Sequence, residues 1–136
     1  ISKGQKMSTS TIIRKEIVVN GGTPISAQET LVSDGHEEIS FVIAGNATND
    51  GKEFVSNDAS RVGVIITTTG EVTMKTNSSG SPTQTIVLTA NNPIVWTEND
   101  VAADPLDGDI NGLYFTNAGG SAVTVTITIL KDTVEL

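Results

Sequence analysis

The stretch DGDING, residues 107–112, places oxygen-bearing side chains where a calcium-binding loop has its first ligands. Asp107, Asp109 and Asn111 stand at the first, third and fifth positions, and glycine stands at the sixth. A complete loop also needs a bidentate carboxylate at the twelfth position, which here is Ala118. We therefore expect a polar turn without a resident metal or other cofactor. The three residues stay weak candidate ligands, with a looser calcium site as the alternative.

Other catalytic arrangements are equally incomplete. His36 is the one histidine, and its context, SDGHEEISF, has neither a second histidine nor the spacing of a zinc protease motif. The chain has no cysteine, no G-x-S-x-G elbow and no glycine-rich phosphate loop. Because no nucleophile–base pair or metal set can be assembled, the sequence predicts a protein that is not an enzyme.

The charge distribution divides the chain into two parts. Lys3, Lys6, Arg14 and Lys15 give residues 1–15 a charge of +4, whereas residues 16–136 carry −12. We predict a basic, extended N-terminal arm over 1–15 that binds a partner, and one domain over 16–136. The acidic domain would repel phosphate backbones, so we expect no nucleic-acid partner. The chain contains no run of 18 apolar residues, so we expect no membrane span.

Short alternating segments predict an all-β domain, because threonine and valine are abundant and glycine or asparagine recurs between the segments. In 122–130, AVTVTITIL, Val123, Val125, Ile127 and Ile129 would point to the core and the threonines away from it. Nine strands are predicted in all: 11–19, 29–33, 38–44, 61–68, 71–76, 84–89, 94–97, 113–116 and 122–130. Their number and spacing favour an antiparallel two-sheet β-sandwich or jelly roll.

Three local features refine this picture. Residues 45–60, GNATNDGKEFVSNDAS, read as a long loop with a helical turn near 52–55. The pattern T-N-x-x-G-S occurs at 76–81 and again at 116–121, which predicts two similar hairpins. Trp96, in PIVWT, is predicted to anchor the core or an interface.

Two blocks in the C-terminal half resemble a group of small all-β proteins encoded among the structural genes of tailed bacteriophages. The first block, KTNSSGSP followed by I-x-L-x-A-x-x-P-x-x-W, runs from Lys75 to Trp96. The second, D-x-x-x-L-Y-x-T-N, runs from Asp109 to Asn117, and an alternating strand follows it. The resemblance covers roughly residues 72–132. It implies a virion structural protein and brings no catalytic residues.

The resulting expectation is a capsid decoration or cement protein that binds the lattice of a major capsid protein. It would be located on the capsid surface of a virion assembled in the host cytoplasm. We expect a homo-oligomer, with a trimer as one option, whose binding residues are Lys3, Lys6, Arg14, Lys15 and Trp96. Two alternatives remain open: a tail, neck or fibre component of the virion, and a secreted β-sandwich adhesion or carbohydrate-binding module.

Overall fold

The computed structural model describes residues 9–18 and 20–132 and is built almost entirely of strands. The elements in chain order are β1 (Thr9–Ile17), β2 (Ile25–Ser33), β3 (Gly35–Ile43), β4 (Asp50–Lys52), the short 3-10 helix η1 (Asp58–Ser60), β5 (Arg61–Thr68), β6 (Val72–Thr76), β7 (Gln84–Leu88), β8 (Ile94–Thr97), β9 (Leu113–Thr116) and β10 (Val123–Lys131). The described residues contain no helix long and apolar enough to cross a membrane.

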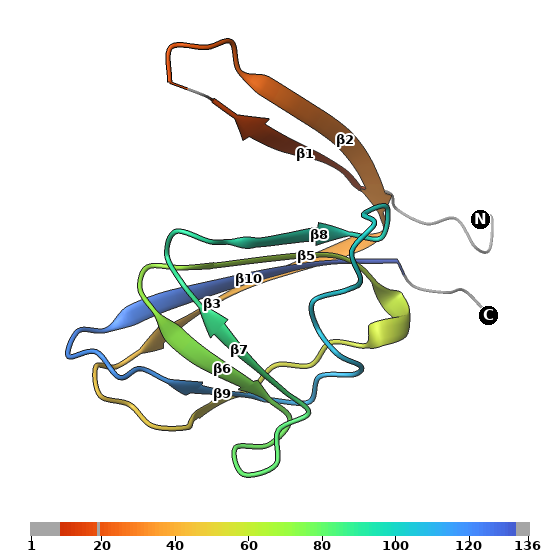
Figure 1. The fold of residues 1–136 in the computed structure, drawn as a ribbon. Coiled ribbons are helices and arrows are strands. Elements are labelled where there is room, and N and C mark those ends of the chain that lie inside the picture. The colour runs from red at the N-terminus through yellow and green to blue at the C-terminus, as the bar shows by residue number, and fades with distance from the viewer. Residues whose placement is uncertain (1–8, 19, 133–136) are drawn as a thin grey trace.

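Eight of these strands form two antiparallel four-stranded sheets that face each other (Figure 1). One sheet has the order β3-β10-β5-β8 and the other has the order β4-β9-β6-β7. This arrangement is that of a jelly roll, so the predicted all-β sandwich is confirmed. Strands β1 and β2 form a separate two-stranded sheet.

The core lies between the two sheets and follows the predicted alternation. Val123, Val125, Ile127 and Ile129 on β10 are all buried, whereas the threonines between them are partly exposed. From the other sheet, Phe115 on β9 meets Phe41 on β3 with ring centroids 5.8 Å apart. Since side chains along a strand alternate between its two faces, each strand gives one apolar face to this core.

The prediction for residues 45–60 is wrong in its detail. Asp50–Lys52 forms β4, and the helical turn lies at Asp58–Ser60 rather than near 52–55. β4 pairs with β9, and a side chain at Gly51 would come within 3.2 Å of the ring of Tyr114. The letters NDGK suggest a turn, but the glycine serves a close approach between strands. Tertiary pairing here overrides local propensity.

The repeated T-N-x-x-G-S pattern gives one hairpin and not two. Residues 76–81 join β6 to β7, which pair as predicted. Residues 116–121 join β9 to β10, which belong to different sheets. The side chain of Asn117 donates hydrogen bonds to the carbonyls of Ile43 and Ala44 at the end of β3, at 3.3 and 3.2 Å. This second turn therefore crosses between the sheets.

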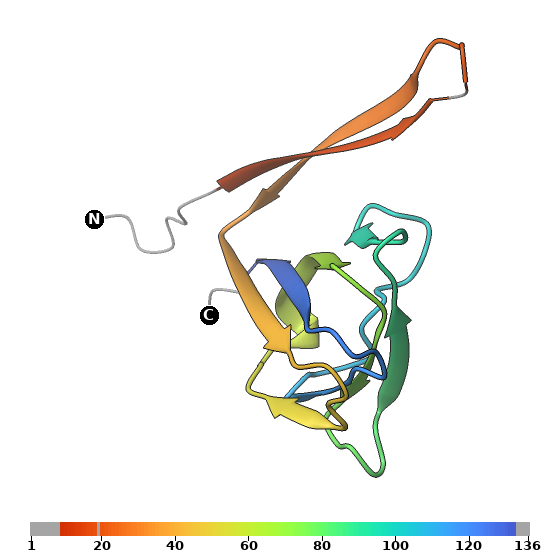
Figure 2. The ribbon, with the colours of Figure 1, turned by 90° about the vertical axis from the view of Figure 1, so that its left-hand side faces the viewer.

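The β1–β2 hairpin projects from the sandwich on the side of β8 (Figures 1 and 2). The two strands pair antiparallel from Thr9 with Ser33 to Ile17 with Ile25. β2 continues into β3 across Asp34, so the second strand of the hairpin leads directly into the first sheet. Of the predicted N-terminal arm, residues 1–8 lie outside the described residues, and 9–15 form most of β1.

Candidate functional site

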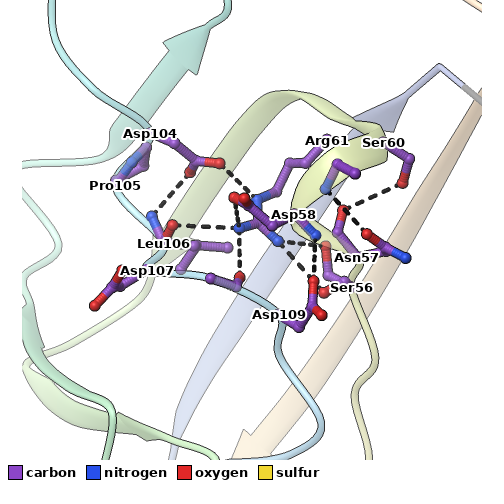
Figure 3. Close-up of polar contacts among 12 residues, drawn as sticks. Ser56, Asn57, Asp58, Ser60, Arg61, Asp104, Pro105, Leu106, Asp107 and Asp109 are labelled. Carbon is purple, nitrogen blue, oxygen red and sulfur yellow. Dashed lines mark hydrogen bonds and ion pairs between the residues drawn. The ribbon is translucent and has the colours of Figure 1, made fainter.

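A buried arginine organises the loops at one end of the sandwich (Figure 3). Arg61 begins β5 directly after η1, and its side chain is fully buried. The guanidinium donates to one carboxylate on each of two loops, Asp104 Oδ2 at 2.8 Å and Asp58 Oδ1 at 3.2 Å. Its further acceptors are Ser56 Oγ at 2.9 Å, the Leu106 carbonyl at 3.2 Å and the Gly108 carbonyl at 2.8 Å. The buried charge is therefore paired and hydrogen-bonded, as burial of an ion requires.

This arginine occupies the inside of the turn that carries the candidate metal ligands. Asp109 Oδ1 accepts a hydrogen bond from the Asp58 amide at 2.8 Å. Asp107 is exposed, and its carboxylate points to the opposite side of the turn from that of Asp109 (Figure 3). Asn111 is also exposed, and its backbone amide donates to Asn77 Oδ1 at 2.7 Å. Within the same turn, the Gly108 carbonyl accepts a hydrogen bond from the guanidinium of Arg61.

Among the described residues, no three acidic, histidine or cysteine side chains gather closely enough to hold a metal ion. His36 lies exposed on β3, opposite Leu130 of β10 in the strand register. The Arg61 cluster pairs a buried cation with acidic and carbonyl acceptors, and it joins η1 to the loop of residues 104–109.

Two of the predicted binding residues of the arm, Arg14 and Lys15, lie on opposite faces of the hairpin. Lys3 and Lys6 lie outside the described residues. Arg14 is exposed and donates to Gln28 Oε1 on the neighbouring strand at 3.1 Å. Lys15 lies on the opposite face of β1, where its Nζ forms an ion pair with Asp100 Oδ1 at 3.2 Å. Of the two described residues of this set, Lys15 faces the sandwich and Arg14 lies on the other face.

Trp96 on β8 is partly buried against the core, and its indole N–H donates to the Ala102 carbonyl at 2.9 Å. It also lines an open groove of about 470 Å³ beside β8, which we call the β8 groove. The groove is lined by Lys15, Pro93, Ile94, Val95, Trp96, Asp100, Val101, Ala102, Ala103 and Pro105. The fold therefore brings Lys15 and Trp96, both predicted as binding residues, to one surface.

Hydrogen bonds join the base of the hairpin to the end of β8. Glu29 on β2 accepts a hydrogen bond from Thr97 Oγ1 at 2.8 Å and another from Asn99 Nδ2 at 3.4 Å. Thr97 is buried. Leu31 on β2 packs with Val62 and Leu130 of the first sheet in a small buried apolar cluster. These contacts and the Lys15–Asp100 ion pair fix the direction in which the hairpin leaves the sandwich.

The far end of the hairpin is apolar and uncovered, which the sequence analysis did not predict. Ile17 and Ile25 lie opposite each other and are 65% and 68% exposed, and Val18 is 61% exposed. The signal for this surface was present in the sequence, because residues 17–28, IVVNGGTPISAQ, contain no charged side chain. We call the described residues of this segment the tip. Exposed apolar side chains that lie together indicate an interaction site.

Neither a protein-family model nor a curated protein matches this chain. A solved structure described as "Bacillus endospore appendages form a novel family of disulfide-linked pili" is similar over 98% of this chain and 96% of its own chain. The sequence identity is 14% and the TM-score is 0.36. A similarity this low carries no functional argument.

Proposed function

We propose that this chain is a non-enzymatic structural protein that is built into a larger assembly. The observation that carries the proposal is the β1–β2 hairpin, which projects from the sandwich with an exposed apolar tip (Figure 2). A two-stranded hairpin is marginally stable in water unless it packs against something else. Among the described residues, the base of the hairpin is packed through Leu31 and Glu29, whereas Ile17 and Ile25 at the tip are exposed. The tip is therefore a contact surface for a neighbouring subunit.

The assembly that we propose is the virion of a tailed bacteriophage, in which the chain decorates the capsid. The support for this narrower proposal is the resemblance over residues 72–132, a region that runs from β6 to β10. The residues that carry the resemblance include Thr76, Leu88 and Leu113, which are buried, and Asn77 and Asn117, which hold turns. Their positions in the fold support a shared architecture. The location of the chain in the virion is tested by electron microscopy, as described below.

A decoration role fits the charge of the domain and the way in which the hairpin is attached to it. The net charge of −8 keeps assembled particles apart in solution. The partner would be a major capsid protein or another virion protein, and the many equivalent sites of a capsid lattice add avidity to weak single contacts. The hairpin, held by Glu29 and Lys15, presents its tip to such a lattice in one fixed direction.

Immunogold electron microscopy tests the location directly. Antibodies raised against the purified chain are applied to phage particles induced from the strain that carries the gene. Gold distributed over the faceted head is the expected result. Gold restricted to the tail or to one vertex would replace decoration by the tail, neck or fibre role. Particles that carry no gold, with the antigen found instead at the cell surface, would contradict the virion assignment and favour a secreted adhesion module.

A further inference from the structure

The tip has no charged side chain and the β8 groove has no net charge, on a chain whose net charge is −8. We propose that the tip of one copy docks in the β8 groove of a second copy of this chain. The inference deepens the proposed function by naming a partner of the hairpin. It rests only on the broader part of that function, the role as an assembly subunit.

The inner face of the hairpin supplies the surface that docks. Ile13, Lys15 and Ile17 alternate along one face of β1, and Ile25 lies opposite Ile17 on the same face. At the base, this face is packed, because Ile13 is buried. At the tip, the same face carries Ile17 and Ile25 with about two thirds of their surface open. The sandwich therefore covers this face at the base of the hairpin and leaves it exposed at the tip.

The β8 groove has the matching chemistry. Its floor and walls are apolar or small, and Val101 is fully exposed at its rim. The only charged side chains that line it, Lys15 and Asp100, lie 3.2 Å apart and neutralise each other. An uncharged apolar β-ribbon can enter such a groove without the cost of burying an unpaired ion.

The tip of the same molecule is held away from its own groove. Lys15 lines the groove, and the strands continue from there away from the sandwich (Figures 1 and 2). The contacts of Glu29 with Thr97 and of Lys15 with Asp100 fix this direction. Since a paired ribbon cannot fold back on itself within a few residues, the tip that reaches the groove comes from another molecule.

One chain carries both the exposed apolar tip and an apolar groove, which points to a second copy of the chain as that molecule, and electrostatics permits the contact. Two copies with a charge of −8 repel each other wherever their acidic surfaces meet. The tip has no charge and the groove has a neutral pair, so contact between them brings no like charges together. Such a contact joins two different surfaces of the chain, and it can therefore close into a ring or continue into a chain of subunits.

The test measures self-association of the full-length chain by sedimentation velocity from about 1 µM to about 1 mM, the range in which modest interfaces form. Three proteins are compared: the wild type, the tip variant Ile17→Asp/Ile25→Asp, and the control variant Ile12→Asp/Val32→Asp. Ile12 and Val32 lie on the outer face of the same hairpin and are also exposed. The control therefore adds the same charge to the same element.

Trp96 provides a second readout, because it is the only tryptophan in the chain and it lines the groove. We expect the wild type and the control variant to associate, with tryptophan emission that shifts to shorter wavelength as the concentration rises. The tip variant is expected to stay monomeric without such a shift. The groove variant Val101→Asp is expected to behave like the tip variant. Circular dichroism confirms that each variant is folded.

Several results would overturn the inference. A wild-type chain that stays monomeric over the whole range would assign the tip to a different protein. A tip variant that associates as well as the wild type would remove the tip from the interface. Association of the Val101→Asp variant at the wild-type level would remove the groove. Equal loss in the Ile12→Asp/Val32→Asp control would show that the effect is not specific to the inner face. None of these results depends on whether antibodies label a virion.

Discussion

Strand β10 and the β1–β2 hairpin both carry isoleucine side chains, which are buried on β10 and exposed at the tip of the hairpin. On β10, Ile127 is 1% exposed because both neighbouring strands and the opposite sheet surround it. On the hairpin, Ile17 has one neighbouring strand and is 65% exposed. Burial of an isoleucine in the sandwich stabilises the fold, whereas the isoleucines of the tip leave apolar surface in water. The difference separates a region that holds the chain together from a region that is available to a partner.

Matched substitutions should reveal this difference most strongly. Ile127→Ala removes a fully buried side chain and is expected to lower the free energy of unfolding by about 4 kcal/mol. Ile17→Ala removes the same atoms from the tip and is expected to cost no more than about 1 kcal/mol, mainly through strand propensity. Urea unfolding of the dilute, monomeric proteins measures both values. Equal costs for the two substitutions would mean that the tip is packed within its own chain.

The Arg61 cluster tests whether the loops of the sandwich are held as firmly as its core. Arg61→Met keeps much of the apolar stem but leaves Asp104 and the carbonyls of Leu106 and Gly108 without their donor. We expect the free energy of unfolding to fall by about 3 kcal/mol, because buried polar groups lose their partner. Arg14→Met is the control, because Arg14 is exposed and its side chain donates a hydrogen bond to the exposed side chain of Gln28. A cost for Arg61→Met as small as for this control would contradict the structural role.

The smallest expected effect concerns the junction between the two regions. Glu29→Ala removes the acceptor of Thr97 and Asn99 at the base of the hairpin. Loss of these bonds costs about 1 kcal/mol locally, so amide hydrogen exchange in β1 and β2 should become about fivefold faster. Exchange in β10 should not change. Glu38→Ala, at an exposed position on β3, is the control and should leave the hairpin amides unaffected. Uniform acceleration throughout the domain would show that the hairpin and the sandwich unfold as one unit.

Much of the sandwich could be predicted from the sequence, because strand alternation is a local property. The bounds of three predicted strands, 61–68, 94–97 and 113–116, agree with those of β5, β8 and β9. In β9, Leu113 and Phe115 are buried and Tyr114 lies on the other face, as the alternation predicted. These segments contain β-branched or aromatic residues and turn residues at their ends, so local preference and tertiary pairing agree.

The Arg61 cluster could not be predicted in the same way. The motif DGDING suggested a calcium loop because the spacing of its oxygen atoms resembles one. The cation beside that turn is a guanidinium from a residue 46 positions earlier, and nothing in the local sequence connects Arg61 with Asp107. β4 was missed for a related reason, because its pairing with β9 is a long-range contact that the three residues of β4 do not encode.

The sequence by itself determined the class of the fold and, in a regularly alternating strand such as β10, which side chains face the core, since both follow from a repeat of two residues along the chain. It also contained the uncharged segment 17–28. Only the tertiary structure decided which apolar faces are covered, because coverage depends on which strands pair and on where each sheet ends. Ile127 and Ile17 both stand on β-strands. One lies between two strands beneath a second sheet, and the other lies on the hairpin, toward the tip from the Lys15–Asp100 ion pair.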